Sequence, residues 1–270
     1  MKLLIQKHST AFWRVTFDNP PLNLLDPEMV DELVELMGNL ENDPEVKVVV
    51  FDSANPDFFM AHLDIVKAAT EVPKIGSSGL PIWVELGLRL ERAPFITVGV
   101  VRGRARGVGS EILQMLDVRF ASRERAILAQ IEVGCGIFPG GGGMERLPRL
   151  IGRARAMEVI IGADDFNADT AERYGWVNRS IPDAELDAFV ERFAARVSSF
   201  DPAAIAAAKA IINERSGGLV KGEDQMATQA RFYELLVRPE AQARLGVLFQ
   251  KGLQQDGELE LRLGELIGSE

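Results

Sequence analysis

Two glycine-rich apolar stretches decide the fold, VRGRARGVGSEILQMLDVRFA at positions 101–121 and AQIEVGCGIFPGGGG at positions 129–143. They place Glu111 and Glu132 among residues of the kind that form a protein core. Burying a carboxylate without a partner costs free energy, so a chain that puts two of them in such segments is expected to use them. A pair of buried carboxylates is typical of general acid/base chemistry.

The first stretch belongs to a pattern of strand, loop, helix and strand that occurs twice. VKVVVFDS (46–53) predicts a buried strand, followed by a loop and a helix that begins near Asp64. FITVGVV (95–101) predicts a second strand, RGRARGVG (102–109) a glycine loop, SEILQMLD (110–117) a short helix and VRFAS (118–122) a further strand. Successive units of this kind indicate a layered α/β fold, in which loops at one edge of the sheet bind ligands.

The flanking segments complete the predicted domain organisation. Residues 3–17 predict two short strands joined by a polar turn, and Asp26 before Pro27 predicts the start of a helix. From about position 198 strand signals end, and residues 202–214 and 223–267 predict helices. We therefore expect a core over residues 1–197 and a C-terminal helical oligomerisation lobe over residues 198–270.

Composition limits the partners. A hydrophobic content of 47% over 270 residues supports a full core, and a net charge of −10 argues against nucleic acid as a partner. The single Cys135 excludes an internal disulfide, and His8 and His62 add no zinc-like spacing, so no metal site is expected. The N-terminus lacks the pattern of a signal peptide and no apolar run reaches membrane-spanning length. The expected location is cytoplasmic.

Five segments in order, VVFDS, FFMAHLDI, RGRARGVGSEILQMLDVRFAS, IEVGCGIFPGGGGMERLPRLIG and AERYGWVNR, resemble the enoyl-CoA hydratase/isomerase (crotonase) superfamily over roughly residues 10–200. The resemblance implies a spiral of repeated strand-strand-helix turns with a C-terminal helical lobe. It also implies homotrimers or homohexamers and acyl-CoA thioester substrates. No cofactor is expected, because CoA is part of the substrate.

The resemblance further implies two backbone N–H groups that polarise the thioester carbonyl, those of Leu63 and Val108. His62 and Val108 stand where the family commonly has glycine. A β-branched residue tolerates positive φ poorly, so we expect Val108 to have helical dihedral angles in the first turn of its helix. For His62, an acid/base role and a supporting hydrogen-bonding role both remain open.

Glu111 and Glu132 fall where hydratases of this family keep their catalytic glutamates. The expected function is hydration of a 2-enoyl-CoA thioester by a lyase of fatty acid metabolism, with an oxyanion hole for the enolate. The alternatives are an isomerase or hydrolase that uses Glu132, or a non-catalytic acyl-CoA-binding paralogue. Structural roles are also open for each glutamate: capping a helix, or pairing with Arg104, Arg106 or Arg119.

Further substrate contacts are expected from residues beside these groups. In the C-terminal lobe, Phe249 and Lys251 occupy places that the family uses against CoA. The remaining expected contacts surround the oxyanion donors and the second glutamate: Ala61, His62, Asp64, Gly107, Gly109, Gly134, Pro139 and Gly140.

Overall fold

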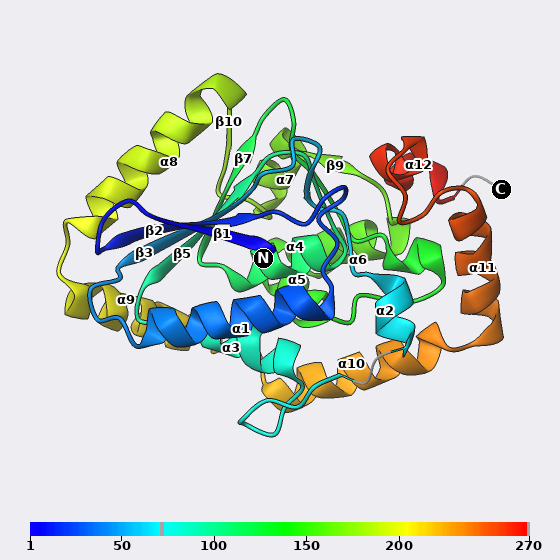
Figure 1. Ribbon diagram of the computed structural model, residues 1–270, viewed down its shortest axis with the longest axis horizontal. Coiled ribbons are helices and arrows are strands. Elements are labelled where there is room, and N and C mark those ends of the chain that lie inside the picture. Colours follow the sequence, from blue (N-terminus) through cyan, green and yellow to red (C-terminus); the bar gives the residue numbers. More distant parts are fainter. Residues whose placement is uncertain (71–72, 269–270) are drawn as a thin grey trace.

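The structure is a computed structural model and describes residues 1–70 and 73–268 (Figure 1). Within these residues the strands form two sheets, ordered β1-β2-β3-β5-β7-β10 and β4-β6-β8-β9. The strands are β1 (Leu3–Lys7), β2 (Phe12–Phe17), β3 (Val48–Ser53), β4 (Phe58–Met60), β5 (Ile96–Val101), β6 (Arg104–Arg106), β7 (Val118–Ser122), β8 (Ile127–Ala129), β9 (Phe166–Asn167) and β10 (Arg179–Ile181).

The larger sheet is parallel except for the hairpin of β1 and β2 at its edge. Its central strand β3 is buried on both faces, as expected for a parallel sheet covered on two sides. Val49 and Phe51 face the main core, whereas Val48 and Val50 pack toward α8 (Asp183–Ser198). On the main-core side lie α1 (Pro27–Glu41), α3 (Ile82–Arg92) and α4 (Val108–Met115).

The two sheets are linked by a spiral. After β5 the chain enters β6 and then α4, and after β7 it enters β8 and then a short 3₁₀ helix, η1 (Glu132–Cys135). The strand-strand-helix turns expected from the resemblance are therefore present. Strands β4 and β6 lie in segments that we expected to be loops, so the loop prediction was wrong there. Each has only three residues, too few for an alternating pattern to be recognised.

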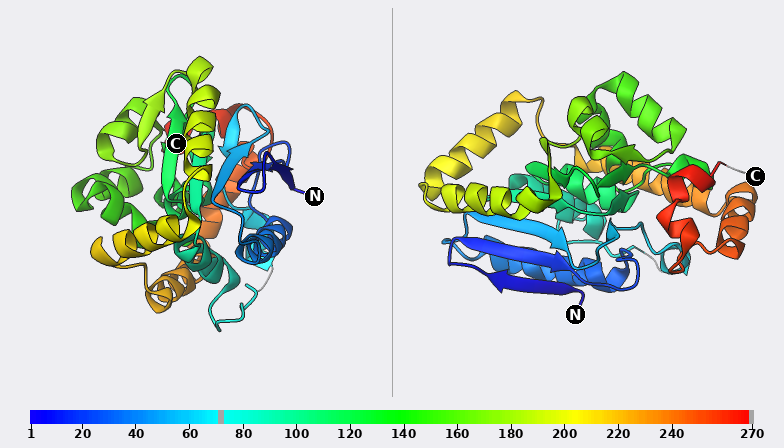
Figure 2. Two further views of the ribbon diagram at one scale, coloured as in Figure 1. Left: turned by 90° about the vertical axis from the view of Figure 1, so that its left-hand side faces the viewer. Right: turned by 90° about the horizontal axis from the view of Figure 1, so that it is seen from above.

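Four further helices belong to the spiral: α2 (Ile65–Thr70), α5 (Gly143–Ile151), α6 (Arg153–Gly162) and α7 (Ala168–Tyr174). The C-terminal part then contains α9 (Pro202–Arg215), α10 (Gly222–Leu236), α11 (Pro239–Gln250), α12 (Glu258–Leu261) and α13 (Leu263–Leu266). The helical region expected over 223–267 is divided first before Pro239, which begins α11, and again by the turn after Gln250. Figures 1 and 2 show α8 and α9 at one end of the long axis and α11 and α12 at the other.

The C-terminal helices pack against the core. A second hydrophobic cluster joins Ile131, Cys135 and Ile137, around η1, to Phe232 of α10 and Leu245 of α11. The segment that carries Glu132 is therefore packed against the C-terminal helices.

A buried cation attaches α9 to the core. Lys209, only 6% exposed, donates through Nζ to the carbonyls of Leu90 and Phe95 and to Asp117 Oδ2 at 2.8 Å. Asp117 also accepts from the backbone and hydroxyl of Thr97. The acid at the end of α4 is therefore structural, and its charge is balanced inside the protein.

We expect Lys209→Met to lower the free energy of unfolding by about 3 kcal/mol, because the substitution leaves Asp117 and two carbonyls unpaired. Urea denaturation followed by circular dichroism at a fixed protein concentration measures the change. Lys221→Met, at an exposed position before α10, is the matched control. A Lys209→Met protein as stable as the control would contradict the structural role of this ion pair.

Candidate active site

A cavity of about 170 Å³ lies where the spiral meets the C-terminal helices. Its walls come from the start of α1, residues 62–65, the start of α3, the start of α4, η1 and the glycine loop before α5. Phe232 and Tyr233 of α10 close one side. Both glutamates singled out in the sequence line this cavity.

Glu111 lies in the first turn of α4 and is 2% exposed. Its Oε1 accepts hydrogen bonds from the backbone N–H of Gly141 at 2.9 Å and of Gly143 at 2.8 Å. Since Gly143 is the first residue of α5, the carboxylate also caps that helix. Oε2 has no hydrogen-bond donor among the described residues, so one oxygen of a cavity-lining carboxylate remains available.

The glycines of the PGGGG loop allow this close approach. A Cβ atom on Gly141 would lie 2.4 Å from Glu111 Oε2, and Gly142 has a φ of +116°, which residues with a side chain rarely adopt. Trp83 Nε1 and Gln225 Nε2 both donate to the Gly141 carbonyl at 3.0 Å. The loop is therefore fixed from outside while its N–H groups point at the carboxylate.

Glu132 begins η1 and is 8% exposed. Gln130 Nε2 donates to its two carboxylate oxygens at 3.1 and 3.3 Å, and Gln130 Oε1 in turn accepts from Gln114 Nε2 at 2.9 Å. Sequence analysis did not identify Gln130 or Gln114. The position of Gln130, two residues before Glu132, could have predicted this contact. Gln114 lies in a different segment, and no local pattern links it to Glu132.

The surroundings of the two glutamates favour protonation. Burial raises the pKa of Glu111 to about 7, an effect that the N–H groups of Gly143 and Gly141 partly offset. Burial, together with the charge of Glu111, raises the pKa of Glu132 to about 8. The pair can therefore hold one proton between its members near neutral pH.

The arginines considered as partners bind elsewhere. Arg104 donates to the Leu261 carbonyl, Arg106 pairs with Asp165, and Arg119 donates to the carbonyls of Leu113, Leu116 and Trp176. The proposed pairing of a glutamate with one of these arginines is wrong for this structure, because all three guanidinium groups bind those partners instead.

The backbone N–H groups of Leu63 and Val108 belong to cavity-lining residues, and neither has an acceptor among the described residues. The Leu25 N–H donates to the His62 carbonyl at 3.0 Å, and the Asp64 N–H donates to the Leu25 carbonyl at 2.8 Å. Backbone groups alternate in such a bridge, so the Leu63 N–H points away from Leu25. Gly107 has a φ of +52°, and Val108 is the first residue of α4, with the helical conformation expected for a β-branched residue.

Only some of the other expected contacts line the cavity, namely His62, Asp64, Gly107 and Gly140. Gly109 instead packs against the Met60 carbonyl, and Phe249 packs in the C-terminal cluster. Ala61, Gly109, Gly134, Pro139, Phe249 and Lys251 are not among the lining residues. Cys135 is buried at the cavity wall, and burial raises the pKa of its thiol to about 12, so it is a packing residue.

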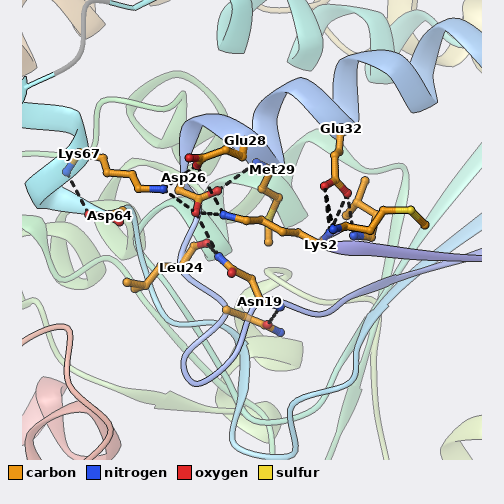
Figure 3. Close-up of polar contacts among 12 residues, drawn as sticks. Lys2, Asn19, Leu24, Asp26, Glu28, Met29, Glu32, Asp64 and Lys67 are labelled. Carbon is orange, nitrogen blue, oxygen red and sulfur yellow. Dashed lines mark hydrogen bonds and ion pairs between the residues drawn. The ribbon is translucent and has the colours of Figure 1, made fainter.

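A charged cluster at the rim, absent from the sequence analysis, joins α1 to α2 (Figure 3). Lys67 Nζ contacts Glu28 at 2.6 Å and Asp26 at 3.2 Å, while Asp26 also pairs with Lys2. The Lys67 backbone N–H donates to Asp64 at 3.0 Å. The cluster holds the segment that carries the Leu63 donor beside the start of α1.

No helix in the described part of the chain is long and apolar enough to cross a membrane. Residues 1–70 and 73–268 also contain no group of three or more histidine, cysteine or acidic side chains arranged to hold a metal ion.

Comparison with known proteins agrees with this geometry. The chain is 36% identical over 204 residues to the short-chain-enoyl-CoA hydratase of Clostridium acetobutylicum, which covers 74% of this chain and 76% of the relative. It is 32% identical over 206 residues to the crotonyl-CoA hydratase of Syntrophomonas wolfei, covering 74% and 77%. A crystal structure of a protein from Streptomyces avermitilis described as an enoyl-CoA hydratase superposes with a TM-score of 0.94 at 44% identity, over 100% of this chain and 97% of that one.

A family model for enoyl-CoA hydratase/isomerase matches residues 7–252, which include all of the described strands except β1 and the whole cavity wall except Leu253. Since the match spans most of the chain and the fold contains the same repeated turns, the protein belongs to the enoyl-CoA hydratase/isomerase family.

Proposed function

We propose that the protein adds water to the double bond of a 2-enoyl-CoA thioester. The observation that carries the proposal is the convergence of two buried carboxylates and two unpaired backbone N–H groups on one cavity. The hydratase names of the relatives that are 36% and 32% identical support the same substrate class.

The different partners of the two glutamates assign their roles. Glu111 accepts backbone N–H bonds of 2.9 and 2.8 Å, which favour its ionised form. Glu132 accepts from its own backbone N–H and, at 3.1 and 3.3 Å, from the Gln130 amide, and the charge of Glu111 favours its protonated form. Glu111 is therefore the base that takes a proton from water, and Glu132 is the acid. The Leu63 and Val108 N–H groups donate to the thioester oxygen.

The steps balance without a further reactant. The water oxygen forms a bond to C3 while Glu111 takes its proton, and the π electrons move to give an enolate held by the two N–H groups. Glu132 then gives its proton to C2, and the carbonyl re-forms. Proton return from Glu111 to Glu132 restores the enzyme, so no cofactor is required.

We propose that the protein acts as a homotrimer or homohexamer. Phe200, Ile211 and Ile212 are exposed apolar residues just before or within α9, and Met157 and Ile161 are exposed on α6. Apolar residues gathered on helices in this way are typical of subunit interfaces. We expect light scattering at micromolar concentration to give three or six times the 29.7 kDa chain mass. A monomeric mass would contradict this assembly.

We expect Glu111→Gln and Glu132→Gln each to lower the rate of crotonyl-CoA hydration by about 10²–10⁴-fold, because the amide cannot transfer the proton. Loss of the enoyl thioester absorbance band measures the rate. Glu185→Gln, on the exposed face of α8, is the control and retains the parental rate. A folded Glu111→Gln protein with near-parental hydration would contradict the assignment of Glu111 as the base.

We expect kcat/KM for hydration to follow a narrow bell-shaped pH profile. Activity falls as the pH drops below the Glu111 pKa of about 7, because the base becomes protonated. It also falls as the pH rises above the Glu132 pKa of about 8, because the acid loses its proton. Initial rates at low substrate concentration, measured from about pH 5 to about pH 10, give the profile. A constant kcat/KM across this range would be inconsistent with these assignments.

A further inference from the structure

One C-terminal helix contacts the chain immediately before both proposed oxyanion donors. Helix α12 contributes Glu260, which has an exposed fraction of 0%. Its side chain meets His62, the residue before Leu63, and its carbonyl accepts from Arg106, which lies two residues before Val108. The family model ends at residue 252, so α12 lies outside the matched region.

The side-chain contact holds the first donor segment. His62 Nε2 lies 3.0 Å from Glu260 Oε1, and His62 Nδ1 lies 2.8 Å from the Leu63 carbonyl. Gln254 strengthens the same connection, because its Oε1 accepts from the Ile65 N–H at 2.9 Å and its Nε2 donates to Asp64 at 3.0 Å. The Gln254 N–H donates to Glu260 Oε1 at 2.6 Å. Residues 62–65 are thus bonded to the C-terminal segment on both sides of Leu63.

The backbone contacts hold the second donor segment. Arg106 donates to the carbonyls of Glu260 and Leu261, and Arg104 Nε donates to the Leu261 carbonyl at 2.7 Å. Both arginines belong to β6, which leads through Gly107 to Val108. The Arg106 side chain is fully buried, so this connection is fixed within the core.

The contact between His62 and Glu260 is an ion pair. Both histidine nitrogens face oxygen acceptors, which requires a proton on each nitrogen. Burial alone would lower the pKa of His62, but the Glu260 carboxylate outweighs this effect and the pKa is raised. Arg106, the other charged group beside the pair, is itself neutralised by Asp165. The second oxygen of Glu260 has no hydrogen-bond partner among the described residues, so removing His62 would leave a buried charge unpaired.

We propose that Glu260 and His62, together with the Gln254 side chain, are positioning residues that set the Leu63 N–H against the Val108 N–H and so fix the geometry of the oxyanion hole. The inference rests on the proposed hydratase function, because the two N–H groups need a fixed separation only if they bind one oxygen. None of these side chains needs to touch the reacting atoms. Donors displaced by about 1 Å lose much of their effect on the transition state.

The test compares crotonyl-CoA hydration by the parent, Glu260→Ala and Glu260→Gln proteins. We expect Glu260→Ala to lower kcat about 10- to 100-fold with a much smaller change in KM, because the lost interaction acts on the transition state. Glu260→Gln retains most of the activity, since its amide oxygen can take the place of Oε1 and accept from both the His62 Nε2–H and the Gln254 N–H. Glu258→Ala, an exposed position in the same helix that pairs with Arg262, is the control.

A spectroscopic probe separates positioning from loss of folding. The absorbance band of para-dimethylaminocinnamoyl-CoA moves to longer wavelength when its carbonyl is polarised. We expect this shift to be smaller with Glu260→Ala than with the parent, Glu260→Gln and Glu258→Ala proteins. Folded Glu260→Ala protein that matches the parent in both kcat and band shift overturns the proposal.

Two further outcomes are decisive. If Glu260→Ala does not fold, Gln254→Asn replaces it, because asparagine tolerates the φ of +62° at this position but is too short to reach Asp64 and Ile65. An unchanged band shift in Gln254→Asn then overturns the proposal, and a reduced shift supports it. A parent protein that neither hydrates crotonyl-CoA nor shifts the probe overturns the proposed function, and this inference with it.

Discussion

The structure depends on burying two carboxylates in an apolar cavity where no cation of the described residues contacts them directly. Moving an ionised carboxylate out of water costs several kcal/mol even in a relaxed protein. For Glu111 the compensation comes from two backbone N–H groups, and for Glu132 it comes from its own backbone N–H and one amide side chain. Because the Glu111 donors are backbone atoms, the loop that supplies them must approach closely, which explains why Gly141 cannot carry a side chain. The second stretch is therefore rich in glycine because it must supply close backbone donors to the Glu111 carboxylate of the first stretch.

Three buried cations, Arg119, Lys209 and Arg106, bind other groups and do not contact the two glutamates. Arg119 is buried, yet it donates to carbonyl groups at the end of α4 and to Trp176. Lys209 binds two carbonyls and Asp117. Arg106 neutralises Asp165. Each cation therefore satisfies orphaned backbone oxygens or a separate acid. Arg146, also buried, pairs with Glu91 and lowers the pKa of Glu111 only in part. A guanidinium in direct contact with either glutamate would lower its pKa further and remove the proton that the pair can hold near neutral pH.

Local signals in the sequence predicted much of this arrangement. The cap at Asp26, the strands around 46–53 and 95–101 and the glycine stretches identified the elements that carry the cavity, and the structure contains them. Strand β6 was missed because three residues, two of them arginine, give no hydrophobic alternation. The partner of His62 could not be predicted for a different reason. Glu260 lies in a distant segment, and only the complete fold brings it to the ring nitrogen.

The single proton that Glu111 and Glu132 can hold has a consequence for the charge of the whole cavity. In the proposed reaction Glu111 becomes neutral as the substrate becomes an enolate, and Glu132 becomes negative as the enolate is discharged. Each step moves one negative charge from one group to the next, and the total stays at one. An apolar cavity stabilises a second charge poorly, but it tolerates the displacement of a charge that it already contains. The net charge of the cavity therefore does not change during the reaction. The free energy needed to bury a charge is not required a second time when the enolate forms.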